Sequence, residues 1–70
     1  MSTATIKRKT NGSFHIVITD NEKTEEYNGR NVSVVPDGSR YEIAFTITKV
    51  IGSTTRIINK SFIVDSYSYL

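Results

Sequence analysis

The fold is decided by residues 40–64, RYEIAFTITKVIGSTTRIINKSFIV, in which apolar and polar side chains alternate with a period of two. This alternation is typical of strands with one buried face, because successive side chains point to opposite sides of a sheet. One face carries the apolar side chains Tyr41, Ile43, Phe45 and Ile47. The next strand continues that face with Ile58, Phe62 and Val64. A loop at residues 52–55 pairs Phe45 with Phe62 and Ile43 with Val64, so the two faces meet.

The same period extends over the whole chain, and no stretch shows the 3.6-residue period of a helix. Turn residues separate strands at about 3–9, 13–19, 24–35 (interrupted), 40–50 and 56–64. Val, Ile, Thr, Tyr and Phe predominate, as is usual in strands. The sequence predicts an all-β fold and a single domain over residues 1–70: a five-stranded antiparallel meander, either a strongly twisted sheet or a small barrel.

Pairing of apolar faces also predicts the remaining registers. A loop at residues 10–12, with Gly12 in the left-handed region, pairs Ile6 with Ile16 and Ala4 with Ile18. The turn at 20–23 sets Tyr27 opposite Ile16, and a loop at 36–39 brings Val34 near Tyr41. Tyr27 and Val32 then differ in phase, which predicts a bulge or a corner at Asn28-Gly29. The predicted core is Ile6, Phe14, Ile16, Ile18, Tyr27, Val32, Val34, Tyr41, Ile43, Phe45, Ile47, Ile58, Phe62 and Val64.

Composition argues against an enzyme and against a bound metal or other cofactor. The 70 residues contain no cysteine and one histidine, too few for a thiolate site or a histidine cluster. His15 lies on an outer strand position, and the adjacent Glu25 and Glu26 point to opposite faces, so they cannot act as a paired acid and base. The N-terminus lacks a long apolar stretch, so we expect no signal peptide and no membrane contact, and a cytoplasmic location, or the host cell interior if the protein is viral.

The outer face is the most informative surface. The predicted pairing sets Val50 against Ile57 and Ala44 against Ile63 on the side away from the core, where a solvated sheet should be polar. Such a patch indicates a contact surface for a protein partner or a second copy. The tail has Tyr67 and Tyr69 on one side; it either continues the last strand or adds to a neighbouring sheet edge.

We therefore predict a non-catalytic interaction module, self-associating or docking on another protein, of the size of a phage-type accessory or structural protein. Its partner-binding residues are Val50, Ile57, Ile63, Tyr67 and Tyr69. The alternative is a small barrel that binds single-stranded nucleic acid through Lys7, Lys9, Arg56 and Lys60. The net charge of +2 gives this alternative little support, and Lys7 and Lys9 also suit an N-terminal edge strand protected from aggregation.

Overall fold

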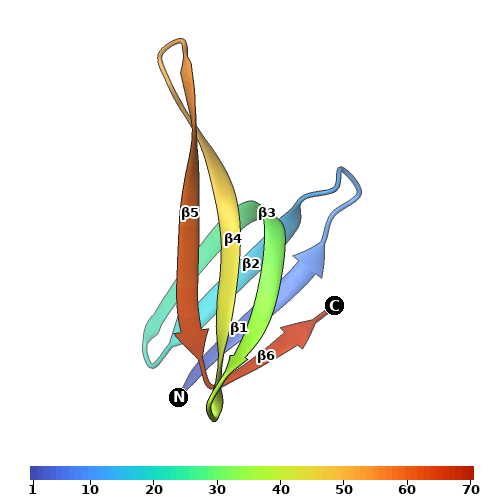
Figure 1. The fold of residues 1–70 in the computed structure, drawn as a ribbon, viewed down its shortest axis with the longest axis vertical. Helices are drawn as coiled ribbons and strands as arrows, with labels where there is room; N and C mark the ends of the chain where they lie inside the picture. Colours follow the sequence, from blue (N-terminus) through green and yellow to red (C-terminus); the bar gives the residue numbers. More distant parts are fainter.

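A computed structural model describes residues 1–70 and shows an all-β domain without helices. Its strands are β1 (Ser2–Arg8), β2 (Phe14–Asp20), β3 (Lys23–Asp37), β4 (Arg40–Ile51), β5 (Thr54–Val64) and β6 (Ser66–Tyr69). They form one six-stranded sheet in the order β5-β4-β3-β2-β1-β6 (Figure 1). The five-stranded antiparallel meander is confirmed for β1 to β5, and β6 makes the sheet mixed because it runs parallel to β1.

The first of the two predictions for the tail, that it continues the last strand, is wrong. The strand β5 ends at Val64, and Asp65 separates it from β6. Residues 66–69 then pair with the free edge of β1 in the register Thr3↔Ser66 to Ile6↔Tyr69. The predicted N-terminal edge strand is therefore wrong, since β1 lies between β2 and β6. The sheet bends strongly but is not closed into a barrel, so the twisted-sheet alternative is the right one.

The bend is made within β3. Residues 23–29 of this strand pair with β2, and residues 30–37 pair with β4. Between Arg30↔Thr46 and Ser33↔Ala44, two residues, Asn31 and Val32, oppose Phe45 alone, and Asn31 has a φ of 54°. This is the bulge that the change of phase predicted, placed a little after Asn28-Gly29. It lets β4 and β5 cross over β1 and β2 as a second layer (Figure 1).

The core lies between these layers and consists of Ala4, Ile6, Ile16, Ile18, Ile43, Phe45 and Val64. Around it pack the partly buried side chains Phe14, Tyr27, Val32, Val34, Tyr41, Ile47 and Phe62. The predicted core is confirmed except for Ile58, which is half-buried beside Ile47 and does not reach the cluster. Ala4 belongs to the core because its small side chain faces Ile18 across the β1–β2 pair.

The registers of the two later hairpins differ from the prediction by two residues. Ile43 pairs with Phe62 and Phe45 with Lys60, because the turn consists of Gly52-Ser53 alone. Gly52 has a φ of 61° and Ser53 does not have a positive φ, which is the arrangement of a type II′ turn that matches strand twist. Likewise the turn Gly38-Ser39 pairs Val34 with Ile43 instead of Tyr41. A register shift of two residues leaves each side chain on the same face of the sheet, so this error does not change which side chains face the core.

The registers of the first two hairpins are confirmed. Ile6 pairs with Ile16, Ala4 with Ile18, and Ile16 with Tyr27. Gly12 has a φ of 83°, and the backbone N–H of Lys9 donates to the carbonyl of Ser13 at 2.8 Å, which closes the predicted loop at residues 10–12.

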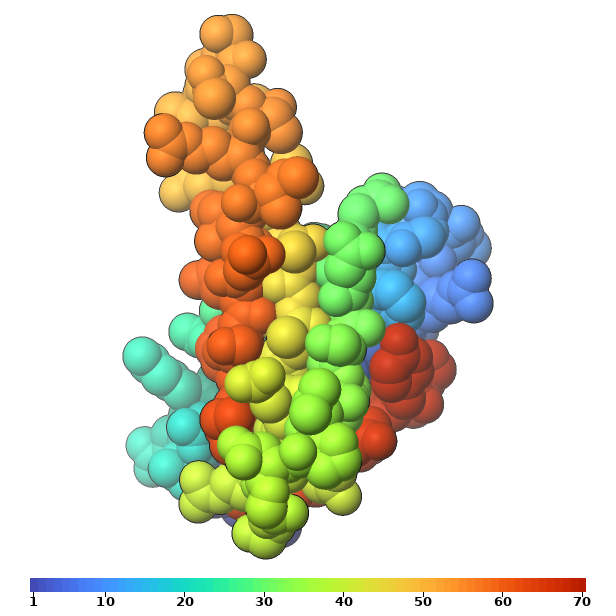
Figure 2. Space-filling model, in the orientation of Figure 1, coloured from blue at the N-terminus to red at the C-terminus, as the bar shows by residue number.

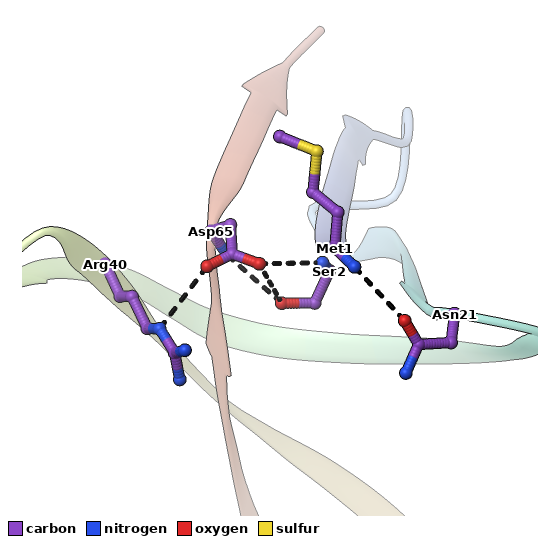
Figure 3. A network of polar contacts seen from close by, with 5 residues as sticks. All are labelled: Met1, Ser2, Asn21, Arg40 and Asp65. Atoms are coloured by element: carbon purple, nitrogen blue, oxygen red, sulfur yellow. Dashed lines mark hydrogen bonds and ion pairs between the residues drawn. The ribbon is translucent and has the colours of Figure 1, made fainter.

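Polar contacts among Ser2, Asp65 and Arg40, which we call the polar clasp, join the start of β1 and the start of β4 to the junction between β5 and β6 (Figure 3). The N–H of Ser2 donates to Oδ2 of Asp65 at 2.9 Å, and the N–H of Asp65 donates to the carbonyl of Ser2 at 3.0 Å. Arg40 Nε lies 3.3 Å from the other carboxylate oxygen. These contacts, the Ser2 backbone hydrogen bond foremost, lower the pKa of the Asp65 carboxyl. The clasp thus fixes the point at which the chain leaves β5 for the far edge of the sheet.

Candidate functional site

The most prominent surface feature is the end of the β4–β5 hairpin, which projects beyond the rest of the sheet (Figures 1 and 2). Pairing of β4 with β3 ends at Arg30↔Thr46, whereas β4 and β5 continue to pair with each other up to Ile51↔Thr54. Every residue from 48 to 57 is exposed. We call residues 48–57 the arm; it is a two-stranded ribbon with no third strand beside it.

The arm carries aliphatic side chains on both of its faces. Val50 is 67% exposed and Ile57 is 74% exposed on the outer face, and Ile51 is 55% exposed on the other. The predicted direct pairing of Val50 with Ile57 is wrong, because the short turn pairs Val50 with Thr55 and Ile57 with Thr48. The two side chains remain diagonal neighbours on one face, within contact range for long side chains.

Ile63 lies apart from the two aliphatic residues of the arm. On the outer face of β5, Asn59 and Ser61 separate it from Ile57, and across the strands it pairs with Glu42 rather than Ala44, which pairs with Ser61. Six residues of strand correspond to about 20 Å. Ile63 is 42% exposed, so it is available to a partner, but it forms no continuous stripe with the arm.

The rings of the terminal tyrosines each contact another aromatic ring of the sheet. The ring of Tyr67 meets that of Tyr41 edge-on at 4.9 Å between centroids, and Tyr69 meets Phe14 in the same way at 6.0 Å. Both tyrosines lie on β6, remote from the arm (Figure 1). They are still 40% and 52% exposed, so a part in partner binding stays a prediction.

An open groove of about 490 Å³ lies between the β2–β3 turn and the end of β5. Its apolar lining consists of Ile18, Phe62 and Ile63. Three carboxylates, Asp20, Glu22 and Glu25, surround these side chains, together with one cation, Lys23. The groove is therefore partly apolar and carries an excess of negative charge.

Charge is segregated along the long axis of the molecule, which measures 42 Å against 24 Å and 22 Å for the other axes. The end with the arm and the β1–β2 loop holds the cations Lys7, Arg8, Lys9, Arg30, Lys49 and Arg56. The end with the groove and the β3–β4 turn holds the carboxylates Asp20, Glu22, Glu25, Asp37, Glu42 and Asp65, with Lys23 and Arg40 as its cationic side chains. The charged side chains are thus unevenly distributed along the long axis, although the net charge is only +2.

The four predicted nucleic-acid contacts come from different elements, and two of them are engaged with neighbouring side chains. Lys7 lies on β1 opposite His15, and Lys9 donates a hydrogen bond from Nζ to Oδ1 of Asn28. Arg56 belongs to the arm, while Lys60 lies 5.7 Å above the ring of Tyr27. Tyr27, Phe45 and Phe62 pack on one another with centroids 5.4–6.0 Å apart, which leaves no free aromatic platform beside Lys60.

The ionisable groups form simple pairs. His15 Nε2 lies 3.1 Å from Glu26 Oε1 on the outer face, and the Tyr27 hydroxyl donates to Glu25 Oε2 at 3.0 Å. Burial, and then the hydrogen bond to Glu25, raise the pKa of the Tyr27 hydroxyl. No group of three or more His, Cys, Asp or Glu residues is arranged to hold a metal ion. The structure also contains no helix long and apolar enough to cross a membrane.

Sequence reasoning missed both the arm and the groove. A signal for the arm was present, since a bulge near residue 29 leaves too few residues before Pro36 to pair with all of β4. The groove had no comparable signal, because Ile18 and Phe62 come from strands that are not neighbours in the sheet.

Comparisons with protein-family models, with curated proteins and with solved structures found no match to this chain.

Proposed function

We propose that this protein is a non-catalytic interaction module that self-associates through its arm. Docking on a different protein is the alternative use of the same surface. The observation that carries the proposal is the arm itself: residues 48–57 project as an exposed ribbon, with Val50, Ile51 and Ile57 each more than half exposed to solvent. Exposed apolar side chains gathered on one element typically mark a contact surface.

The low stability of an isolated two-stranded ribbon and its exposed aliphatic side chains both favour burial of the arm against another protein surface. A two-stranded ribbon is marginally stable in water by itself and needs a further strand or a packing surface for support. The arm has neither within its own chain. Burying a Val or Ile side chain contributes about 1.5–3 kcal/mol, so three such side chains offer a partner substantial binding free energy.

Sedimentation velocity over a wide range of protein concentration tests the proposal. We expect the mass of the wild-type protein to rise with concentration and that of the double variant Val50→Lys, Ile57→Lys to remain that of a monomer. Val35→Lys is the matched control, because Val35 is an exposed valine on the outer face of β3, away from the arm. A wild-type monomer at all concentrations, or equal association of the double variant, would contradict self-association.

The second candidate function is binding of single-stranded nucleic acid at the basic end. The observation that favours it is a group of cations at the β1–β2 loop. Lys7, Arg8 and Lys9 lie at or next to this loop. The guanidinium group of Arg30 lies beside Gly12 of the same loop. Phosphate contacts release counterions, so such binding must weaken steeply with salt. Titration of a labelled oligonucleotide at rising salt tests this function, and the variant Lys7→Gln, Lys9→Gln should bind more weakly with a smaller dependence on salt.

A further inference from the structure

We propose that the arm of one copy inserts into the groove between the β2–β3 turn and β5 of a second copy, so that the copies associate head to tail. The inference rests on the proposed function and names the partner surface. It begins from two features of the molecule, the exposed arm and the acidic groove. The β2–β3 turn, which borders the groove, lies far from the arm (Figure 1).

The two surfaces match in polarity. The arm offers the aliphatic side chains Val50, Ile51 and Ile57, each more than half exposed. The groove offers Phe62 and Ile63, of which Ile63 is 42% exposed. Apolar contact between them would remove both sets from water, which is favourable in proportion to the area covered.

The two surfaces also match in charge. The charged residues of the arm are Lys49 and Arg56, which are direct cross-strand partners and share a face with Ile51. Like charges placed directly opposite destabilise a strand pair, and no carboxylate of the same chain makes an ion pair with either cation. The groove provides Asp20, Glu22 and Glu25 against the single cation Lys23. A second copy thus supplies the anions that the arm lacks.

Symmetry decides the form of the assembly. Contact between two arms would bring four cations together, whereas contact between arm and groove brings opposite charges together. An arm-to-groove contact uses two different surfaces, so each bound copy leaves a free arm and a free groove. We therefore expect assemblies that grow beyond a dimer, as rings or filaments.

A charge-swap experiment followed by sedimentation velocity tests this inference. The arm variant is Lys49→Glu, Arg56→Glu, and the groove variant is Glu22→Lys, Glu25→Lys; circular dichroism confirms that each is folded. We expect each variant alone to lose the concentration-dependent rise in mass at low salt. We expect an equimolar mixture to regain it, because both kinds of contact in the mixture again join opposite charges. Should the groove variant misfold, Glu22→Lys alone replaces it, since Glu22 lies in the turn.

The outcomes separate this inference from the proposed function. A groove variant that assembles like the wild type, beside an arm variant that does not, overturns the groove as the partner surface and leaves the arm as the contact. A mixture that fails to assemble likewise overturns the arm-to-groove contact. An arm variant and the Val50→Lys, Ile57→Lys variant that both assemble like the wild type overturn both proposals.

Discussion

Ser2 and Asp65 exchange backbone-directed hydrogen bonds in both directions, although 63 positions separate them in the chain. The carboxylate accepts from the N–H of Ser2, and the N–H of Asp65 donates to the carbonyl of Ser2. This clasp lies where β5 ends and β6 begins, next to the start of β1 (Figure 3). It allows one short chain to place its last residues on the opposite edge of its own sheet.

The clasp should make stability depend on acid. The pKa of the Asp65 carboxyl is lowered from its ordinary value of 3.8, so its stabilising contribution is fully present above that pH and is lost as pH falls through the folded-state pKa. We expect wild type to lose more thermal stability below about pH 4 than Asp65→Asn does, measured by circular dichroism. Asp37→Asn is the control, since Asp37 makes no side-chain hydrogen bond or ion pair. Identical pH profiles for wild type and Asp65→Asn would exclude the clasp as the cause.

Gly29 should not tolerate a side chain. A Cβ there would lie 2.8 Å from Cδ2 of Phe45, 3.1 Å from Cδ1 of Ile16 and 3.1 Å from the carbonyl oxygen of Thr46. We expect Gly29→Ala to lower the free energy of unfolding by about 1–3 kcal/mol in urea denaturation, as overpacking does. Phe45→Leu should cost less in the Gly29→Ala background than in wild type, because it vacates the contested space. A Gly29→Ala variant as stable as wild type would show that the layers are not in close contact here.

Tyr67 should contribute to folding through its ring and not through its hydroxyl. The ring packs edge-on against Tyr41, and the hydroxyl makes no hydrogen bond within the chain. We expect Tyr67→Ala to lower the free energy of unfolding by about 1–2 kcal/mol, through the lost aromatic pair and the lost area, and Tyr67→Phe to be neutral. If Tyr67→Phe left stability unchanged but reduced association, the hydroxyl of Tyr67 would belong to a contact with a partner.

Lys49→Glu should have opposite effects on stability and on association. It replaces the like-charge pair with Arg56 by an opposite-charge pair, which should stabilise the hairpin by about 0.2–1 kcal/mol in the monomer. The same change removes a cation that we assign to the acidic groove, so association should weaken. Thermal unfolding at low concentration and sedimentation at high concentration measure the two effects. Weakened stability together with weakened association would point to simple damage of the arm.

Local pattern sufficed where a hairpin is short and its faces are distinct. The alternation from Ile6 to Ile18, with Gly12 able to adopt a positive φ, fits a three-residue loop at residues 10–12, and the predicted register is the observed one. The change of phase between Tyr27 and Val32 likewise required a bulge or a corner, and the structure has a bulge. The parity argument could not separate two-residue from four-residue turns, because both bring the same faces together. For this reason the predicted pairing of Phe45 with Phe62 was wrong, and Phe45 pairs with Lys60.

Contacts between segments far apart in the sequence could not be predicted, because no local pattern of residues encodes them. Whether the tail extends β5 or crosses to β1 depends on Asp65 meeting Ser2, and no local pattern encodes that meeting. The groove depends on Phe62 approaching Ile18 across the bend of the sheet. The exposure of Val50, Ile57 and Ile63 follows from alternation, but the projection of the arm follows from the point at which β3 turns from β2 to β4.

Amide hydrogen exchange of the wild-type protein at low and at high concentration tests the covering of the arm most directly. The account predicts that exchange in residues 48–57, and in the β2–β3 turn at residues 20–25, becomes slower at high concentration, while the core strands exchange equally slowly at both. Exchange in the arm that stays fast and unchanged at every concentration would contradict it.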